Sequence, residues 1–151
     1  MELSEFKHTT WETLRGIRIS MEMVFRPVME ECGLTAMQAA LLIEIMESGG
    51  ISVGEAAKSM GLAAANGSAL CKRMEQSGYL IRSRRREDER VVDLALTEKA
   101  KDVLQSAEQA INQRYGKIFQ EEPEENIQVM LKGMQLLEDL LNRLHHEGEK
   151  G

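Results

Sequence analysis

The segment from Gly78 to Thr97 restricts the possible folds of this chain more than any other segment. It begins with a glycine-aromatic turn and an apolar pair, continues as a basic run and a charged turn, and reads GYLIRSRRREDERVVDLALT. Beyond the turn, from Val91 to Leu96, every second residue is a large apolar one, which is the period of a half-buried strand. The segment therefore predicts a β-hairpin, and its charged tip is too polar to lie in a core.

Two short helices are predicted immediately before this hairpin. Ser52 and Glu55 form a capping-box pattern that starts the first helix, and Gly61 is a natural stop for it. The second helix is predicted from about Ala63 to Gln76 by the spacing of its apolar residues. A helix, a turn, a second helix and a basic hairpin form a winged helix-turn-helix, a fold that most often binds DNA.

Longer amphipathic helices are predicted on the N-terminal side of this unit. Apolar residues recur at three- and four-residue steps from Leu14 to Val28, and Pro27 is expected to kink or end that helix. A second capping-box pattern, Thr35 with Gln38, starts the next helix, and a glycine pair closes it.

Two further amphipathic helices are predicted after the hairpin. Thr97 can cap the first, which extends to about Phe119, and a glutamate-rich linker around Pro123 separates it from the last. One small domain cannot cover apolar stripes of this length, so a second copy of the chain is expected to cover them. We expect a mainly α fold with a small β-hairpin wing, in which residues 33–100 bind DNA and residues 1–32 and 101–151 dimerise.

The distribution of charge matters because a net charge of -6 is unusual for a protein that binds DNA. From Ser68 to Arg90, seven basic residues oppose four acidic ones, whereas residues 121–151 hold eight acids and three bases. Salt screens charges over about 8–10 Å, so acids on a remote helix weaken a local basic surface very little. The predicted hairpin and the helix before it are positive and suit a nucleic acid.

Composition and motifs exclude several classes of function. No apolar run approaches the ~20 residues of a membrane span, and the N-terminus lacks the apolar centre of a signal peptide. Cys32 and Cys71 are too few for a disulfide framework and suit the cytoplasm. His145 and His146 have no further ligand at metal spacing, and no nucleophile–base pair or phosphate loop is recognisable. We expect a cytoplasmic protein without membrane contact, metal, cofactor or enzymatic activity.

The second helix of the predicted pair carries the candidate base-reading residues. Its small side chains would let the backbone approach the major groove. The Asn66 carboxamide can hydrogen-bond adenine edges, and Ser68 and Lys72 can reach bases or phosphates. The alternative is an ordinary amphipathic helix with a solvated face. The candidate DNA-binding residues of this helix are Ala64, Ala65, Asn66, Ser68, Lys72 and Arg73.

The charged tip of the hairpin carries the second set of candidates. Arginines beside a recognition helix favour contacts with phosphates and the minor groove, and the alternative is a solvated hairpin that resists edge aggregation. Arg82 lies near the base of the strand and is a candidate for holding the wing to the body instead. The candidate DNA-binding residues of the hairpin are Arg84, Arg85, Arg86, Asp88 and Arg90.

Several short motifs carry a family resemblance over about Gly33–Ala100. They are Gly33-Leu34-Thr35 with Gln38, Glu55-Ala56-Ala57 with Met60-Gly61-Leu62, Lys72-Arg73-Met74-Glu75, Gly78, Arg82, Asp88-x-Arg90 and Leu96-Thr97-Glu98-Lys99. With these motifs the chain resembles the MarR family of bacterial winged-helix regulators. It departs from that pattern at Ala63, where a Ser or Asp often caps the recognition helix, at Ala69, where a basic residue is frequent, and at Glu89, which makes the tip more acidic.

The resemblance implies an obligate homodimer that binds double-stranded DNA, with recognition helices in successive major grooves and wings on flanking minor grooves. It places Arg90 at the wing, oriented by Asp88 through a charge-assisted hydrogen bond. It also implies that a small aromatic, acidic or lipophilic effector, or cysteine oxidation, releases the DNA. The candidate lining of an effector pocket between the winged domain and the dimerisation helices is Trp11, Met21, Phe25, Met46 and Tyr115.

We therefore predict a sequence-specific transcriptional regulator, a repressor, that binds a pseudo-palindromic operator. Two alternatives stay open. The first is a winged-helix module that binds protein rather than DNA, although such a module would not need a basic wing. The second is a regulator of the same family triggered by oxidation of a cysteine, although Cys32 has only acidic neighbours, Glu30 and Glu31, and no adjacent cation to activate its thiol.

Overall fold

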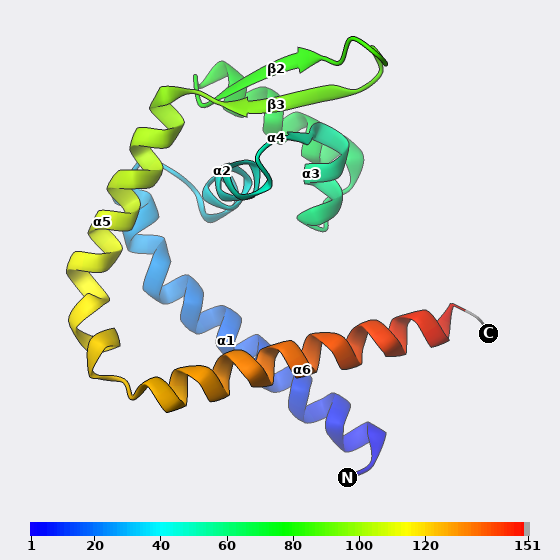
Figure 1. Ribbon diagram of the computed structural model, residues 1–151, viewed down its shortest axis with the longest axis vertical. Coiled ribbons are helices and arrows are strands. Elements are labelled where there is room, and N and C mark those ends of the chain that lie inside the picture. Colours follow the sequence, from blue (N-terminus) through cyan, green and yellow to red (C-terminus); the bar gives the residue numbers. More distant parts are fainter. Residues whose placement is uncertain (150–151) are drawn as a thin grey trace. The chain divides into compact units, whose positions relative to one another are not determined.

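The computed structural model describes residues 1–149 and divides the chain into two compact units, Met1–Ile111 and a second that begins at Asn112 (Figure 1). The first unit holds a winged helix-turn-helix, as predicted, and α5 passes from it into the second unit. The elements are α1 (Leu3–Glu31), α2 (Ala36–Ser48), β1 (Ile51–Ser52), α3 (Val53–Ser59), α4 (Ala64–Gln76), β2 (Leu80–Arg84), β3 (Val92–Leu96), α5 (Glu98–Glu121) and α6 (Glu124–Gly148).

The N-terminal helix α1 continues through Pro27, which lies inside the helix rather than ending it. It ends at Glu31, and Gly33 follows with a φ of 73°, a left-handed conformation that glycine adopts without strain. Only the last turns of α1 are buried, at Val28 and Met29, where the helix meets α2. Of the two outcomes expected at Pro27, a kink or an end of the helix, the second does not occur.

Both predicted capping boxes are present. At the start of α2, the Thr35 hydroxyl accepts a hydrogen bond from the Gln38 amide at 3.2 Å, and the Gln38 side chain accepts one from the Thr35 amide at 3.0 Å. At the start of α3, the equivalent bonds between Ser52 and Glu55 measure 3.1 and 2.8 Å. Each box satisfies amide groups that a helix start leaves without partners, so both helices begin where the sequence indicates.

A three-stranded antiparallel sheet in the order β1-β3-β2 forms the base of the wing. The hairpin of β2 and β3 is present, as predicted. In its register Arg84 lies opposite Val92, the pair nearest the tip. The sequence analysis missed β1, in which Ile51 and Ser52 pair with Leu94 and Asp93. This two-residue strand places β3 in the centre of the sheet and joins it to the start of α3.

The two helices of the helix-turn-helix pack closely because α4 has a glycine where it faces α3. A Cβ atom on Gly67 would lie 2.4 Å from the Cβ of Ala57 and 3.2 Å from its Cα. Around this contact the core of the first unit is apolar and well buried. Its buried side chains include Leu41, Leu42, Ala56, Leu70, Cys71, Met74, Leu80, Leu94, Ala100 and Leu104.

Thr97 caps α5, as predicted. Its hydroxyl accepts a hydrogen bond from the Ala100 amide at 3.2 Å and donates one to the carbonyl of Gly78 at 2.7 Å, so the same side chain fixes the base of the wing. The predicted linker is also present, because the helix breaks between α5 and α6 around Pro123. Within the described residues, α6 buries none of its side chains.

The close approach of α3 and α4 predicts that Gly67→Ala destabilises the protein. Overpacking of this kind costs typically about 1–3 kcal/mol, because Ala57 meets the new methyl group through its backbone as well as its side chain. The matched control is Gly54→Ala in α3, where an added Cβ has nothing within 4 Å and alanine favours the helix slightly. Urea unfolding followed by circular dichroism at one protein concentration measures both changes, and equal stability of the two variants would contradict the packing argument.

Candidate nucleic-acid interface

The helix α4 presents a face of polar and small side chains to solvent. All six residues predicted to contact DNA on this helix are exposed, whereas Gly67, Leu70, Cys71 and Met74 point into the core. Ala63 at the N-cap makes no side-chain hydrogen bond, so the first amides of the helix are not capped by a side chain. Such a helix start can offer its amides and the positive end of its dipole to a phosphate.

The wing projects beyond the sheet as a turn from Arg85 to Val91. The amide of Arg85 donates to the carbonyl of Val91 at 2.9 Å, and the amide of Val91 donates to the carbonyl of Asp88 at 2.9 Å. Arg84 and Arg86 are exposed, and 91% of the Arg90 side chain is accessible to solvent. Three of the predicted arginines are therefore free of packing against the body of the unit.

Asp88 holds the side chain of Arg90, as the family resemblance implied. Its carboxylate accepts hydrogen bonds from the Arg90 Nε at 3.0 Å, from the second guanidinium nitrogen at 3.3 Å and from the Arg90 amide at 3.1 Å. These hydrogen bonds hold the pKa of Asp88 below its ordinary value, so the carboxylate is ionised at neutral pH. The geometry restrains the arginine while leaving most of its surface accessible; its contact with DNA stays a prediction.

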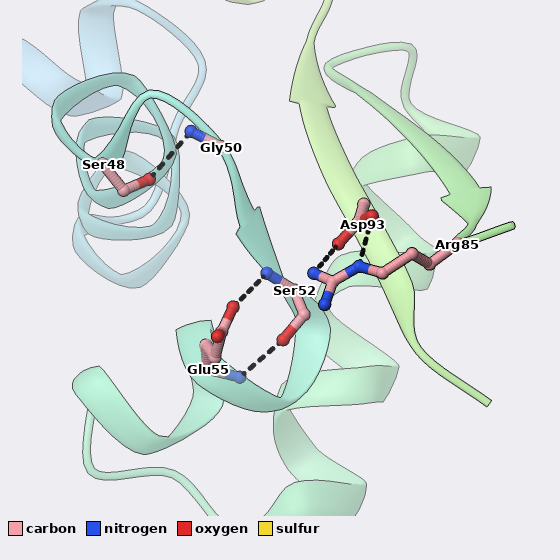
Figure 2. A network of polar contacts seen from close by, with 6 residues as sticks. All are labelled: Ser48, Gly50, Ser52, Glu55, Arg85 and Asp93. Atoms are coloured by element: carbon pink, nitrogen blue, oxygen red, sulfur yellow. Dashed lines mark hydrogen bonds and ion pairs between the residues drawn. The ribbon is translucent and has the colours of Figure 1, made fainter. Parts of the chain in front are cut away.

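Arg85 is placed differently from its neighbours in the basic run. Figure 2 shows its guanidinium bound by the carboxylate of Asp93, with Nε to Oδ2 at 3.0 Å and the second contact at 2.6 Å. The hydrogen bonds to Arg85 lower the pKa of Asp93, and those to Asp93 raise the pKa of Arg85. The sequence analysis grouped Arg85 with the phosphate contacts and did not single out Asp93.

Arg82 connects the wing to the helix-turn-helix, as predicted. Its guanidinium lies 3.5 Å from the Glu75 carboxylate on α4, and its side chain is only 22% exposed. The wing base has a second polar link, because Lys99 donates to the carbonyl of Ser77 at 2.7 Å and stands 4.4 Å from the centre of the Tyr79 ring. Arg82 therefore serves the structure rather than an exposed surface.

An apolar hollow of about 360 Å³ lies in the first unit, between the end of α1, α2 and the first half of α5. Met46 is the one predicted effector-pocket residue that lines it. Trp11 lines a separate hollow along α1, Met21 and Phe25 line neither, and Tyr115 lies in the second unit. The sequence analysis missed most of the lining, which consists of Met29, Ile43, Met46, Lys101, Leu104, Gln105, Ala107, Glu108 and Ile111.

The two cysteines differ in accessibility. Cys71 is buried on the core side of α4 with 1% of its surface exposed, and burial raises the pKa of its thiol. A buried thiol with a raised pKa is a poor nucleophile, because the thiolate is the reactive form. Cys32 is partly exposed at the end of α1. These surroundings give Cys71 a packing role.

Residues 1–149 contain no group of three or more His, Cys, Asp or Glu side chains placed to hold a metal ion. Within the same range, no helix combines the length and the apolar character that a bilayer crossing requires.

Comparison of the sequence with known proteins finds a matching family and a similar protein. The family model for the MarR family matches residues 33–91, which contain the helix-turn-helix and the wing tip. The HTH-type transcriptional repressor MdtR of Bacillus subtilis (strain 168) is 28% identical over 122 residues, covering 74% of this chain and 78% of MdtR.

Solved structures show the same fold. A mutant MarR from E. coli complexed with operator DNA superposes with a TM-score of 0.76 at 13% identity, over 91% of this chain and 99% of that one. NadR in complex with 4-hydroxyphenylacetate superposes with a TM-score of 0.68 at 23% identity, over 87% of this chain and 89% of that one.

The fold, the exposed helix α4 and the cationic wing define a winged helix-turn-helix with a surface that suits a nucleic acid. The family match covers the helix-turn-helix and the wing tip, and the curated relative extends the similarity over most of the chain. In these residues the chain is similar to transcriptional regulators of the MarR family.

Proposed function

We propose that the protein is a homodimeric repressor that binds a pseudo-palindromic operator and leaves it when a small effector binds. The observation that carries the proposal is the pairing of an exposed polar helix face with exposed arginines on the neighbouring wing. Because α4 packs against β2, the two surfaces belong to one unit and can contact one stretch of duplex. The repressor MdtR is the curated relative that supports the direction of regulation.

Different residues have different roles in this proposal. Asn66 and Ser68 read base edges in the major groove, and Lys72 and Arg73 contact bases or phosphates. On the wing, Arg84 and Arg86 meet phosphates, and Arg90 enters the minor groove. A mobility-shift assay against the DNA upstream of its own gene tests the proposal directly. Absence of binding at low salt would favour a winged-helix module that binds protein instead.

Dimerisation is proposed because the outer helices expose large apolar side chains. On α1, Leu14 and Ile17 are 41% and 44% exposed, and on α6 Leu141 and Leu144 are exposed to the same degree. Contiguous apolar surface beyond a few hundred Å² is rare on a monomer, and identical stripes on two chains bury each other symmetrically. Residues 1–32 and 101–151 are the proposed dimerisation segments, and residues 33–100 are the proposed DNA-binding domain.

The effector is proposed to bind in the apolar hollow between α1, α2 and α5. Its lining is apolar apart from Lys101, Gln105 and Glu108, which suits a small aromatic molecule with one polar or anionic group. The complex of NadR with 4-hydroxyphenylacetate supports this chemical class. Lys101, whose ammonium lies 2.7 Å from the Glu98 carboxylate, is the cation available for an anionic group.

The first prediction separates positioning from base reading. Loss of Arg84, Arg86 or Arg90 should weaken binding to all sequences, and each phosphate contact removed should reduce the log–log salt slope by about 0.9. Asn66→Ala should instead cost about 1–3 kcal/mol at particular base pairs and leave the slope nearly intact. Asp88→Ala should be a milder form of Arg90→Ala, because it frees the arginine without removing its charge. Fluorescence anisotropy across a salt series measures these variants, and unchanged affinity and slope for Arg90→Ala would remove the wing from the interface.

The second prediction concerns the oligomeric state. Light scattering at micromolar concentration should give twice the chain mass of 17.0 kDa. Replacing Leu141 and Leu144 together by Glu should shift the mass toward the monomer, because each charge would be buried in an apolar interface without a partner. Ile81→Glu is the control, because Ile81 is also exposed, at 54%, but lies on the wing, and it should leave the dimer intact. A wild-type mass of one chain would contradict the proposal.

The third prediction concerns the effector. 4-Hydroxyphenylacetate should raise the melting temperature and lower the affinity for DNA, because it binds the free protein better than the complex. Lys101→Gln should weaken this ligand about tenfold, the loss of one charge-assisted hydrogen bond, and leave the uncharged analogue 4-methylphenol unaffected. Calorimetry measures both ligands on both proteins. An equal loss of affinity for the two ligands in Lys101→Gln, or a ligand that leaves DNA binding unchanged, would contradict an effector site in this hollow.

A further inference from the structure

The side chains of Arg85 and Asp93 form a diagonal pair across the wing hairpin. The backbone of Arg85 faces Val91, so Asp93 lies two residues further along β3, a spacing that a long side chain can bridge. The guanidinium spans it with two hydrogen bonds, of 3.0 and 2.6 Å, from Nε and one terminal nitrogen to the two carboxylate oxygens. Two parallel hydrogen bonds fix both the direction of the arginine side chain and the orientation of the guanidinium plane, whereas a single hydrogen bond would leave the plane free to turn.

Asp93 is also the point where the wing meets the helix-turn-helix. In the sheet it lies opposite Ser83 of β2 on one side and Ser52 of β1 on the other. Ser52 is the N-cap of α3 and exchanges two hydrogen bonds with Glu55. Figure 2 shows the Arg85 guanidinium lying beside this junction. Hydrogen bonds with Ser52 are the main cause of the lowered pKa of Glu55, and the charge of Arg85 lowers it further. Asp93 is the main cause of the raised pKa of Arg85, and the charge of Glu55 adds to it, so Arg85 and Glu55 lie within electrostatic reach of each other.

We infer that Arg85 is a positioning residue for DNA binding: held by Asp93, it ties the start of the wing tip to the junction of β1 and α3 and so sets the direction of the wing relative to α4. The inference rests on the proposed DNA binding. It differs from the prediction made for Arg85 as part of the basic run, because the Arg85 side chain is directed by the fork toward Asp93 and is 41% exposed, whereas Arg90, although paired with Asp88, is 91% exposed. Arg84, Arg86 and Arg90 then supply the cations that meet the nucleic acid.

The expected effect of losing the Arg85–Asp93 ion pair depends on how exposed the two side chains are. The side chains of Arg85 and Asp93 are 41% and 36% exposed, and ion pairs at this level contribute little to global stability. A small free energy is nevertheless sufficient to bias the tip of the wing, because the other polar links to the body, from Arg82, Thr97 and Lys99, lie at the base of the wing. The effect is therefore expected in the local order of the wing and in DNA affinity, and not in the unfolding transition.

The experiment compares Arg85→Ala, Asp93→Ala and the double variant with Arg86→Ala, the matched control one residue along. Anisotropy of a labelled duplex from the region upstream of the protein's own gene is measured across a salt series. We expect Arg85→Ala and Asp93→Ala to weaken binding about two- to fivefold each, the double variant to be no weaker than either, and the salt slope to stay at the wild-type value. Arg86→Ala should instead reduce the slope by about 0.9.

The two roles of Arg85 give different salt dependences. If Arg85 contacted a phosphate, Arg85→Ala would reduce the salt slope by about 0.9, as Arg86→Ala does, whereas positioning leaves the slope at the wild-type value. A reduced slope for Arg85→Ala, or an Asp93→Ala protein that binds DNA at least as tightly as the wild type, would overturn the inference.

Hydrogen–deuterium exchange of the free protein gives a second readout that needs no DNA. Amides of the wing from 85 to 93 should exchange faster in Arg85→Ala and Asp93→Ala than in the wild type or in Arg86→Ala, at an unchanged unfolding midpoint. Unchanged exchange in the first two variants would overturn the inference even if DNA affinity fell. A wild-type protein that binds no duplex would refute the proposed function, and the exchange result would still decide whether Arg85 positions the wing.

Discussion

Ser52 joins the three parts of the winged unit. Its backbone pairs with Asp93 in the central strand β3, while its hydroxyl and amide exchange hydrogen bonds with Glu55 at the start of α3. Because one residue is both a strand partner and a helix cap, α3 must begin where the wing's central strand passes. The spacing of α4 against α3 is then set at Gly67, where a side chain would meet Ala57. Backbone geometry therefore places the wing beside α4.

The arginines of the wing divide into two groups according to their exposure. Arg82, held by Glu75 of α4, and Arg85, held by Asp93, are partly buried. Arg84, Arg86 and Arg90 are exposed, although Arg84 donates a hydrogen bond to the carbonyl of Glu89 and Asp88 restrains Arg90. A net charge of -6 is therefore compatible with DNA binding, because screening leaves the nearest exposed cations to decide the local potential. Counting arginines in the sequence overstates the number available to a phosphate.

Local rules account for what the sequence predicted correctly. Capping boxes at Thr35 and Ser52 and the alternation after Val91 depend on residues a few positions apart, and the structure confirms each of them. Strand β1 escaped prediction because two residues have no period, and their partners lie far along the chain. The partner of Arg85 could have been found from the hairpin alone, since the register that pairs Arg84 with Val92 puts Asp93 on the diagonal. The apolar hollow could not be predicted, because its lining depends on which turns of three separate helices meet.

The helix α5 links the features that the proposed function requires. Its first residues fix the base of the wing, through the bonds of Thr97 to the carbonyl of Gly78 and of Lys99 to that of Ser77. One turn later the same helix lines the apolar hollow with Lys101 and Leu104. A ligand in that hollow would therefore contact the element that anchors the wing, within a single rigid helix and without a relay through the core. A ligand shifts a conformational equilibrium by the difference between its affinities for the two conformations. In the proposed mechanism, DNA would be released if the ligand bound more tightly to a position of α5 in which the wing no longer matches the DNA groove.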